Sequence, residues 1–119
     1  MDRVVMTVPA GRPFRGVFRL VVGGIGSRCG LSFEHVDELQ LAVVSLLDHR
    51  TAARDTIGLE AEIGDKDLVL VIGPFTEADD VAGRRVTRTL VDRTRTIDRA
   101  GLEWIELSVT LPTSTRAGA

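Results

Sequence analysis

Cysteine is almost absent from this sequence, since Cys29 is the only one among 119 residues. A single cysteine cannot form an intrachain disulfide, and it cannot supply the paired thiolates of a zinc site. The sequence therefore excludes a small secreted scaffold held by disulfide bridges. The compartment we expect is the cytoplasm.

Long hydrophobic runs are also missing. The longest, residues 20–25, is far below the roughly 20 apolar residues that a membrane-spanning helix needs. The apolar run at residues 4–8 follows Asp2 and Arg3 and is too short to be the hydrophobic region of a signal peptide. We therefore expect neither export nor a membrane partner.

An excess of positive charge is absent too. The net charge is −2, and the charged residues, 27% of the chain, intersperse both signs, which argues against nucleic acid as a partner. With 44% hydrophobic residues, a chain of this length makes one domain with a real core. We place that domain at residues 1–112, followed by a flexible polar tail at residues 113–119.

The first half of the chain predicts one strand and two helices. Residues 4–8 place apolar side chains at every second position, which is typical of an edge strand. Apolar residues at three- and four-residue steps predict a helix over residues 13–28. Gly30 fits its terminator, and Ser32 is positioned to cap a second helix over residues 32–50.

Each predicted helix has an apolar face. In the first helix this face groups Phe14, Val17, Phe18, Val21 and Ile25. In the second it groups Val36, Leu39, Val43, Leu46 and Leu47. Ser45 and Asp48 fall elsewhere on the second helix, so we expect them to face solvent or a ligand.

The second half of the chain predicts strands. Residues 57–63 and 68–72 form a hairpin, and residues 91–97 and 104–111 form two closing strands after a short helix at residues 81–90. With the helices covering one face, this order predicts an α/β (α+β) two-layer sandwich whose mixed sheet is largely antiparallel.

Three segments in the first third of the chain carry a resemblance to a known family. They are VVMTVPA, RPFRGVFRLVVGGIGSRCG and LSFEHVDELQLAV. In order, spacing and residue type they resemble the start of the anti-sigma-factor serine kinases of the RsbW type, a branch of the GHKL, or histidine-kinase-like, ATPases. LVLVI, TRTLVD and WIELSVTLP follow in the places where that family would put them.

The resemblance implies three pieces of chemistry. A Glu and an Asn four residues apart on the second helix serve as general base and magnesium ligand, and Ser45 and His49 stand at those positions. An Asp-x-Gly motif ends the buried strand and contacts adenine, but Gly73 and Phe75 replace its two named residues. A glycine-rich lid wraps the phosphates, and only Gly83 remains of it.

These substitutions remove the family's chemistry. A serine cannot act as a carboxylate base, and a lone imidazole is a poor ligand for magnesium, which prefers oxygen donors. The resemblance thus implies a degenerate ATP and magnesium site at Ser45, His49, Gly73 and Gly83. We expect no catalytic residue, no metal site and no cofactor there.

Other polar residues have plainer explanations. Ser45 and His49 have the spacing of a nucleophile and its base, but a serine in the middle of a helix lacks oxyanion donors. His35 is expected to be an exposed residue of the first helical turn, and Cys29 a small half-buried one. Trp104 is a core anchor or an interface aromatic, with the core favoured.

An arginine-rich segment occupies the region where the family holds its lid. It contains Arg84, Arg85, Arg88, Arg93, Arg95 and Arg99. Acidic residues are interleaved with these arginines, so pairing within the chain is favoured over an anion site.

Two functions remain open. One is an anti-sigma-factor-like homodimer that binds a sigma factor, a STAS-type antagonist or both, without ATP-dependent kinase activity. The other is a divergent serine/threonine protein kinase that binds ATP and Mg²⁺. Because the first helix has more apolar residues than one buried stripe needs, we expect the partner surface there. Its residues are Arg12, Arg15, Arg19, Leu20 and Val22.

Overall fold

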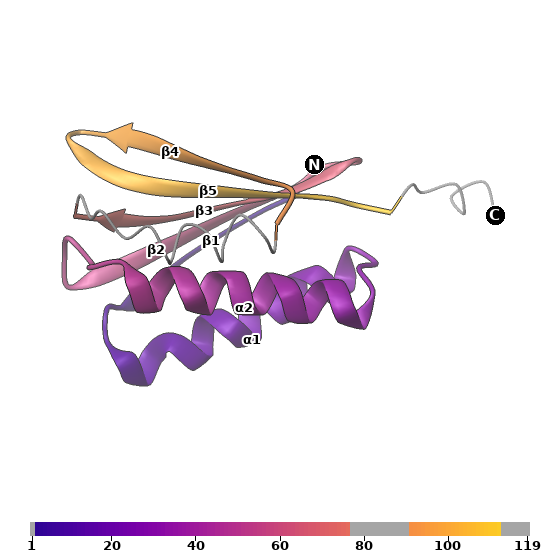
Figure 1. The fold of residues 1–119 in the computed structure, drawn as a ribbon, viewed down its shortest axis with the longest axis horizontal. Coiled ribbons are helices and arrows are strands. Elements are labelled where there is room, and N and C mark those ends of the chain that lie inside the picture. The colour runs from indigo at the N-terminus through magenta and orange to yellow at the C-terminus, as the bar shows by residue number, and fades with distance from the viewer. Residues whose placement is uncertain (1, 77–90, 113–119) are drawn as a thin grey trace.

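The computed structural model describes residues 2–76 and 91–112, which form a sheet with helices on one face (Figure 1). The elements are β1 (Asp2–Pro9), the 3₁₀ turn η1 (Arg12–Phe14), α1 (Arg15–Arg28), α2 (Phe33–His49), β2 (Thr56–Ile63), β3 (Asp67–Phe75), β4 (Arg93–Arg99) and β5 (Leu102–Thr110). The helix predicted at residues 81–90 and the predicted tail lie outside the described residues.

The five-stranded sheet has the order β1-β2-β3-β5-β4, and every pairing between its described strands is antiparallel. The helices α1 and α2 lie together on one side of the sheet (Figure 1). The predicted two-layer sandwich with a largely antiparallel sheet is therefore confirmed. Among the described residues, neither helix is long and apolar enough to cross a membrane.

Local sequence signals set the ends of α2 and the last turn. The Oγ of Ser32 accepts a hydrogen bond from the backbone N–H of His35 at 3.1 Å, which caps the first turn of α2. Between β4 and β5, Ala100 and Gly101 have φ angles of 55° and 82°, as a tight hairpin turn with two left-handed residues requires. Asp98 Oδ1 accepts a hydrogen bond from the Gly101 N–H at 3.0 Å and holds this turn.

The core lies between the sheet and the two helices. Strands β2, β3 and β5 direct alternate side chains into it, as the period of two predicts. Fully buried members from the sheet are Leu59, Leu68, Leu70, Ile72 and Leu107, and from the helices Phe18, Val22, Leu39 and Val43. The opposite face of the sheet carries charged and polar residues.

The buried face of α1 differs from the predicted one. Val22, which was not on the predicted face, is 0% exposed, whereas Val17 and Phe14, which were, are 39% and 40% exposed. This orientation of α1 follows from its close approach to α2. A Cβ on Gly23 would lie only 2.3 Å from Gln40 Nε2. Glycine leaves room for the Gln40 side chain, which donates a hydrogen bond to the carbonyl of Arg19 at 2.9 Å. The prediction failed because it followed bulky side chains, and glycine contributes nothing to such a pattern.

The packing of α1 gives a direct test of this face. Val22→Ala removes two buried methyl groups and leaves a cavity, so it should lower the free energy of unfolding by about 2 kcal/mol. Leu20→Ala, the matched control, should change it by less than about 0.5 kcal/mol, as at other exposed positions. Urea denaturation followed by circular dichroism measures both. Equal losses in the two variants would contradict the orientation of α1.

Candidate functional site

The C-terminal end of α2 carries the two residues that stand at the expected base and magnesium positions. Ser45 is only 7% exposed, which corrects the expectation that it faces solvent or a ligand. It is buried because α2 packs against α1 as well as the sheet, so its buried arc is wider than one stripe. His49 is exposed at the last residue of the helix.

Ser45 and His49 are brought together, but not as a nucleophile and its base. His49 Nδ1 lies 2.8 Å from the backbone carbonyl oxygen of Ser45 and 3.4 Å from its Oγ. A carbonyl oxygen only accepts hydrogen bonds, so Nδ1 carries the hydrogen and donates it. The ring nitrogen that faces the serine therefore has no free lone pair with which to take the hydroxyl proton.

Arg50, the C-cap of α2, was not identified from the sequence as a residue of this region. Its side chain is only 5% exposed, pairs with Glu103 of β5, and lies 5.6 Å from the centroid of the Phe75 ring. The positive charge also suits the negative end of the helix dipole. Arg50 thus ties the end of α2 to the ends of β3 and β5. The only sequence signal for it was its place directly after the helix.

Gly73, the residue at the expected adenine-contacting position, faces away from the helices. Its neighbour Ile72 is in the core, so alternation turns Gly73 to the other face of the sheet, under Trp104. A Cβ on Gly73 would lie 2.8 Å from Trp104 Cδ2 and 3.0 Å from the carbonyl oxygen of Glu103. No side chain fits there, so the adenine-binding carboxylate has no equivalent at Gly73.

Trp104 is half-buried on this open face of the sheet. The guanidinium of Arg99 lies 4.7 Å from its ring centroid, and Arg99 also makes two hydrogen bonds to Glu60, at 2.8 and 3.1 Å. The hydrogen bond from Arg99 lowers the pKa of Glu60, and the charges of Arg99 and Arg3 add to this effect. Trp104 is therefore not an anchor of the core between sheet and helices.

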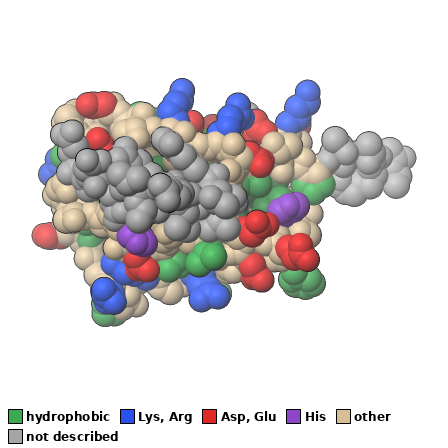
Figure 2. All heavy atoms as spheres, in the orientation of Figure 1, with side chains coloured by type: hydrophobic (Ala, Val, Ile, Leu, Met, Phe, Trp, Pro, Cys, Tyr) green, Lys and Arg blue, Asp and Glu red, His purple; other side chains and the backbone are tan. Residues whose placement is uncertain are grey.

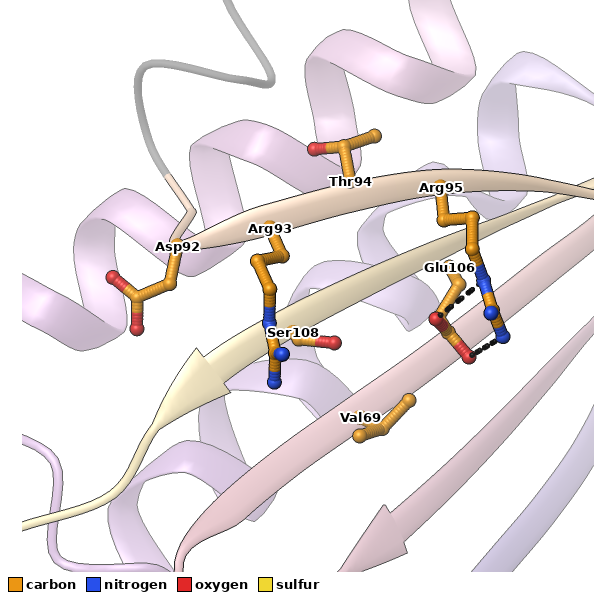
Figure 3. Close-up of a pocket in the computed structure, with 7 residues that line it drawn as sticks. All are labelled: Val69, Asp92, Arg93, Thr94, Arg95, Glu106 and Ser108. Carbon is orange, nitrogen blue, oxygen red and sulfur yellow. Dashed lines mark hydrogen bonds and ion pairs between the residues drawn. The ribbon is translucent and has the colours of Figure 1, made fainter.

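The described arginines of the arginine-rich segment are paired. Arg93 lies 3.4 Å from Asp67, and Arg95 lies 3.1 Å from Glu106. Figure 3 shows Arg93 and Arg95 projecting from β4 over the open face of the sheet, with Arg95 directed at Glu106. Pairing within the chain accounts for these residues. Gly83, Arg84, Arg85 and Arg88 lie outside the described residues.

The remaining candidates have structural roles. Burial raises the pKa of the Cys29 thiol, against the opposing effect of Arg28, so this half-buried cysteine is not activated. His35 is exposed in the first turn of α2, as expected. Within residues 2–76 and 91–112, no three His, Cys, Asp or Glu side chains gather closely enough to hold a metal ion.

Some of the residues predicted to form a partner surface on the first helix are exposed, and others are not. Arg12, Arg19 and Leu20 are exposed, while Arg15 is half-buried and pairs with Asp48. Val22 belongs to the core and must be removed from this surface. Phe14 and Val17 are exposed on α1 in addition to Leu20. Hydrophobic and basic side chains both reach the surface along the helical side of the molecule (Figure 2). We call Phe14, Val17, Leu20, Arg12 and Arg19 the α1 surface.

Comparison with known proteins gives two informative matches, although no family model matches the chain. The serine-protein kinase RsbW of Halalkalibacterium halodurans is 26% identical over 100 residues, which is 81% of this chain and 62% of that kinase. The crystal structure of the RsbU and RsbW domains of Rv1364c from Mycobacterium tuberculosis matches with a TM-score of 0.69 at 14% identity. That match covers 95% of this chain and 33% of the other.

Fold and sequence together define the class, an α+β two-layer domain of the RsbW type. The chain is similar in sequence to the serine-protein kinase RsbW, which agrees with the resemblance seen in its first third. It spans less than two thirds of the length of the kinase that it matches. ATP and magnesium do not fit the described positions, because Ser45, His49 and Gly73 supply neither a carboxylate nor a side-chain amide.

The close contact between Gly73 and Trp104 leads to a stability prediction. Gly73→Ala should destabilise the fold by about 1–3 kcal/mol, because the added methyl group overlaps the indole ring. Gly24→Ala is the matched control, since nothing lies within 4 Å of a Cβ there and alanine favours a helix. In a thermal denaturation cycle, Trp104→Leu should offset part of the Gly73→Ala loss. Strictly additive effects would contradict the contact.

Proposed function

We propose that this chain is an anti-sigma-factor-like regulatory protein that binds a sigma factor, a STAS-type antagonist or both, without ordinary ATP-dependent kinase activity. The homologous kinase is named for serine-protein phosphorylation, so the proposal keeps the binding role of its class and drops the chemistry. A homodimer in the cytoplasm is the form that we propose for it.

The proposal rests on the described positions at which phosphoryl transfer would need a reactive group. The residues at these positions make structural contacts. Ser45 is buried, His49 Nδ1 donates to a backbone carbonyl, and Gly73 lies under Trp104. None of these positions supplies a carboxylate that could act as the general base or coordinate magnesium. Loss of the chemistry with retention of the fold supports a role in binding.

The α1 surface supports the choice of contact region. Leu20 is 77% exposed and Val17 lies one turn before it, so an apolar stripe follows the outer side of the helix. Arg12 and Arg19 flank this stripe with positive charge. Apolar residues rimmed by arginine are typical of protein interfaces. A divergent ATP-dependent kinase is the rival function.

Nucleotide titration separates the two functions. We expect no heat in isothermal calorimetry and no thermal shift with millimolar ATP or ADP in the presence of Mg²⁺, because the oxygen ligands and base are missing. An RsbW-type kinase that retains its Glu and Asn serves as the positive control. Saturable binding to this chain, with phosphate transfer to a STAS protein, would establish the rival function instead.

Partner binding tests the α1 surface. The chain should bind a sigma factor or STAS protein of its source organism, and Leu20→Ser should weaken that binding by at least about tenfold, since a buried leucine contributes about 1.5–3 kcal/mol. Val5→Ser is the matched control, because Val5 is 60% exposed on the sheet side of the domain. Calorimetry and light scattering give affinity and oligomeric state. A monomer that captures neither kind of partner would refute the proposal.

A further inference from the structure

One pocket outside the degenerate nucleotide site concentrates positive charge. It has a volume of about 310 Å³ and lies where the end of β1, η1, the start of α1, the end of α2 and the start of β2 meet. Arg12, Arg15 and Arg50 all line it. Its volume is at the lower end of the range of small-molecule sites. Segments far apart in the sequence thus bring three guanidinium groups to one cavity.

The carboxylates around this pocket do not balance its arginines. Arg15 pairs with Asp48 and also donates to the carbonyl of Leu47 at 3.2 Å, while Arg50 pairs with Glu103. Arg12 has no ion-pair partner among residues 2–76 and 91–112. The Nε of Arg50 is buried, and no described residue accepts its hydrogen bond. Among the described residues, Arg12 is therefore left without a carboxylate partner and the Nε of Arg50 without an acceptor.

The arginines also repel one another. Burial lowers the pKa of Arg15, and the positive charge of Arg12 lowers it further. Both effects mean that the charged form of Arg15 is held at a cost in free energy. An anion bound between the two guanidinium groups would relieve the repulsion and match their forked donors.

Apart from the three arginines and Thr51, most of the lining residues are apolar. Phe18, Leu47 and Ile57 are buried side chains that contribute to the wall. A bare inorganic anion would leave this apolar wall without a partner. A ligand that carries an oxyanion on a small apolar group would satisfy both parts of the lining.

We propose that this pocket binds a small organic anion, a phosphate or carboxylate attached to a compact apolar group, with Arg12 and Arg15 contacting the oxyanion. The site does not depend on the function proposed above, because a free small molecule would occupy it whether or not the chain binds a protein partner. Arg50, a further residue of the lining, is linked to β5 through Glu103.

Titration of the full chain with phenyl phosphate, followed by ¹H–¹⁵N correlation spectra, tests the site. We expect saturable shifts confined to the lining backbone, including Gly11, Arg12, Arg15 and Thr51. Inorganic phosphate and neutral benzyl alcohol should each bind at least about tenfold more weakly, since each satisfies only half of the lining. Benzoate should shift the same residues.

Arg12→Gln should weaken phenyl phosphate binding by about tenfold, the effect of losing one charge-assisted hydrogen bond. Arg12 is exposed, so this variant should fold. Arg28→Gln is the matched control, because Arg28 is exposed on the last turn of α1 outside the pocket. Scattered shifts, equal binding of benzyl alcohol, equal weakening by Arg28→Gln, or binding of an acidic peptide but not of phenyl phosphate would each overturn the proposal.

Discussion

The close approach of α1 to α2 is the contact on which the rest of this domain depends. The Gln40 side chain lies against Gly23, and the Val36 and Leu31 side chains lie against Gly26, so these side chains approach the α1 backbone closely. This contact fixes the rotation of α1. As a result Phe18 and Val22 enter the core while Val17 and Leu20 remain outside. The same rotation brings Arg15 to Asp48 at the end of α2 and thereby forms one wall of the arginine pocket.

The polar groups at the end of α2 make contacts that hold the structure together. In a kinase of this class the resemblance places a base and a magnesium ligand there, but here the polar groups hold helix and sheet together. The pair between Arg50 and Glu103 is more than an exposed salt bridge, because the arginine side chain is almost fully buried against Phe75. A buried pair contributes little net stability, yet loss of either partner would leave the other charge uncompensated.

The face of the sheet opposite the helices carries ion pairs and one aromatic ring. Arg93, Arg95 and Arg99 each meet a carboxylate, and Trp104 lies over Gly58 and Gly73. These exposed pairs contribute modestly to stability, but they cover β3 and β5 with polar groups that face solvent. The two faces of the sheet thus differ, since the helical face forms the core and the other face carries these ion pairs and Trp104.

The sequence by itself determined the element order of the described residues, the caps and turns, the alternation of the strands and the homology to RsbW-type kinases. Each of these follows from neighbouring residues or from their spacing. It also placed Ser45 and His49 at the positions where that family carries its base and magnesium ligand. Only the tertiary structure decided the buried side of α1, the burial of Ser45, the position of Gly73 under Trp104 and the meeting of Arg12, Arg15 and Arg50. These features depend on contacts between distant segments, and glycine, which permits the closest of them, leaves no mark in a hydrophobic pattern.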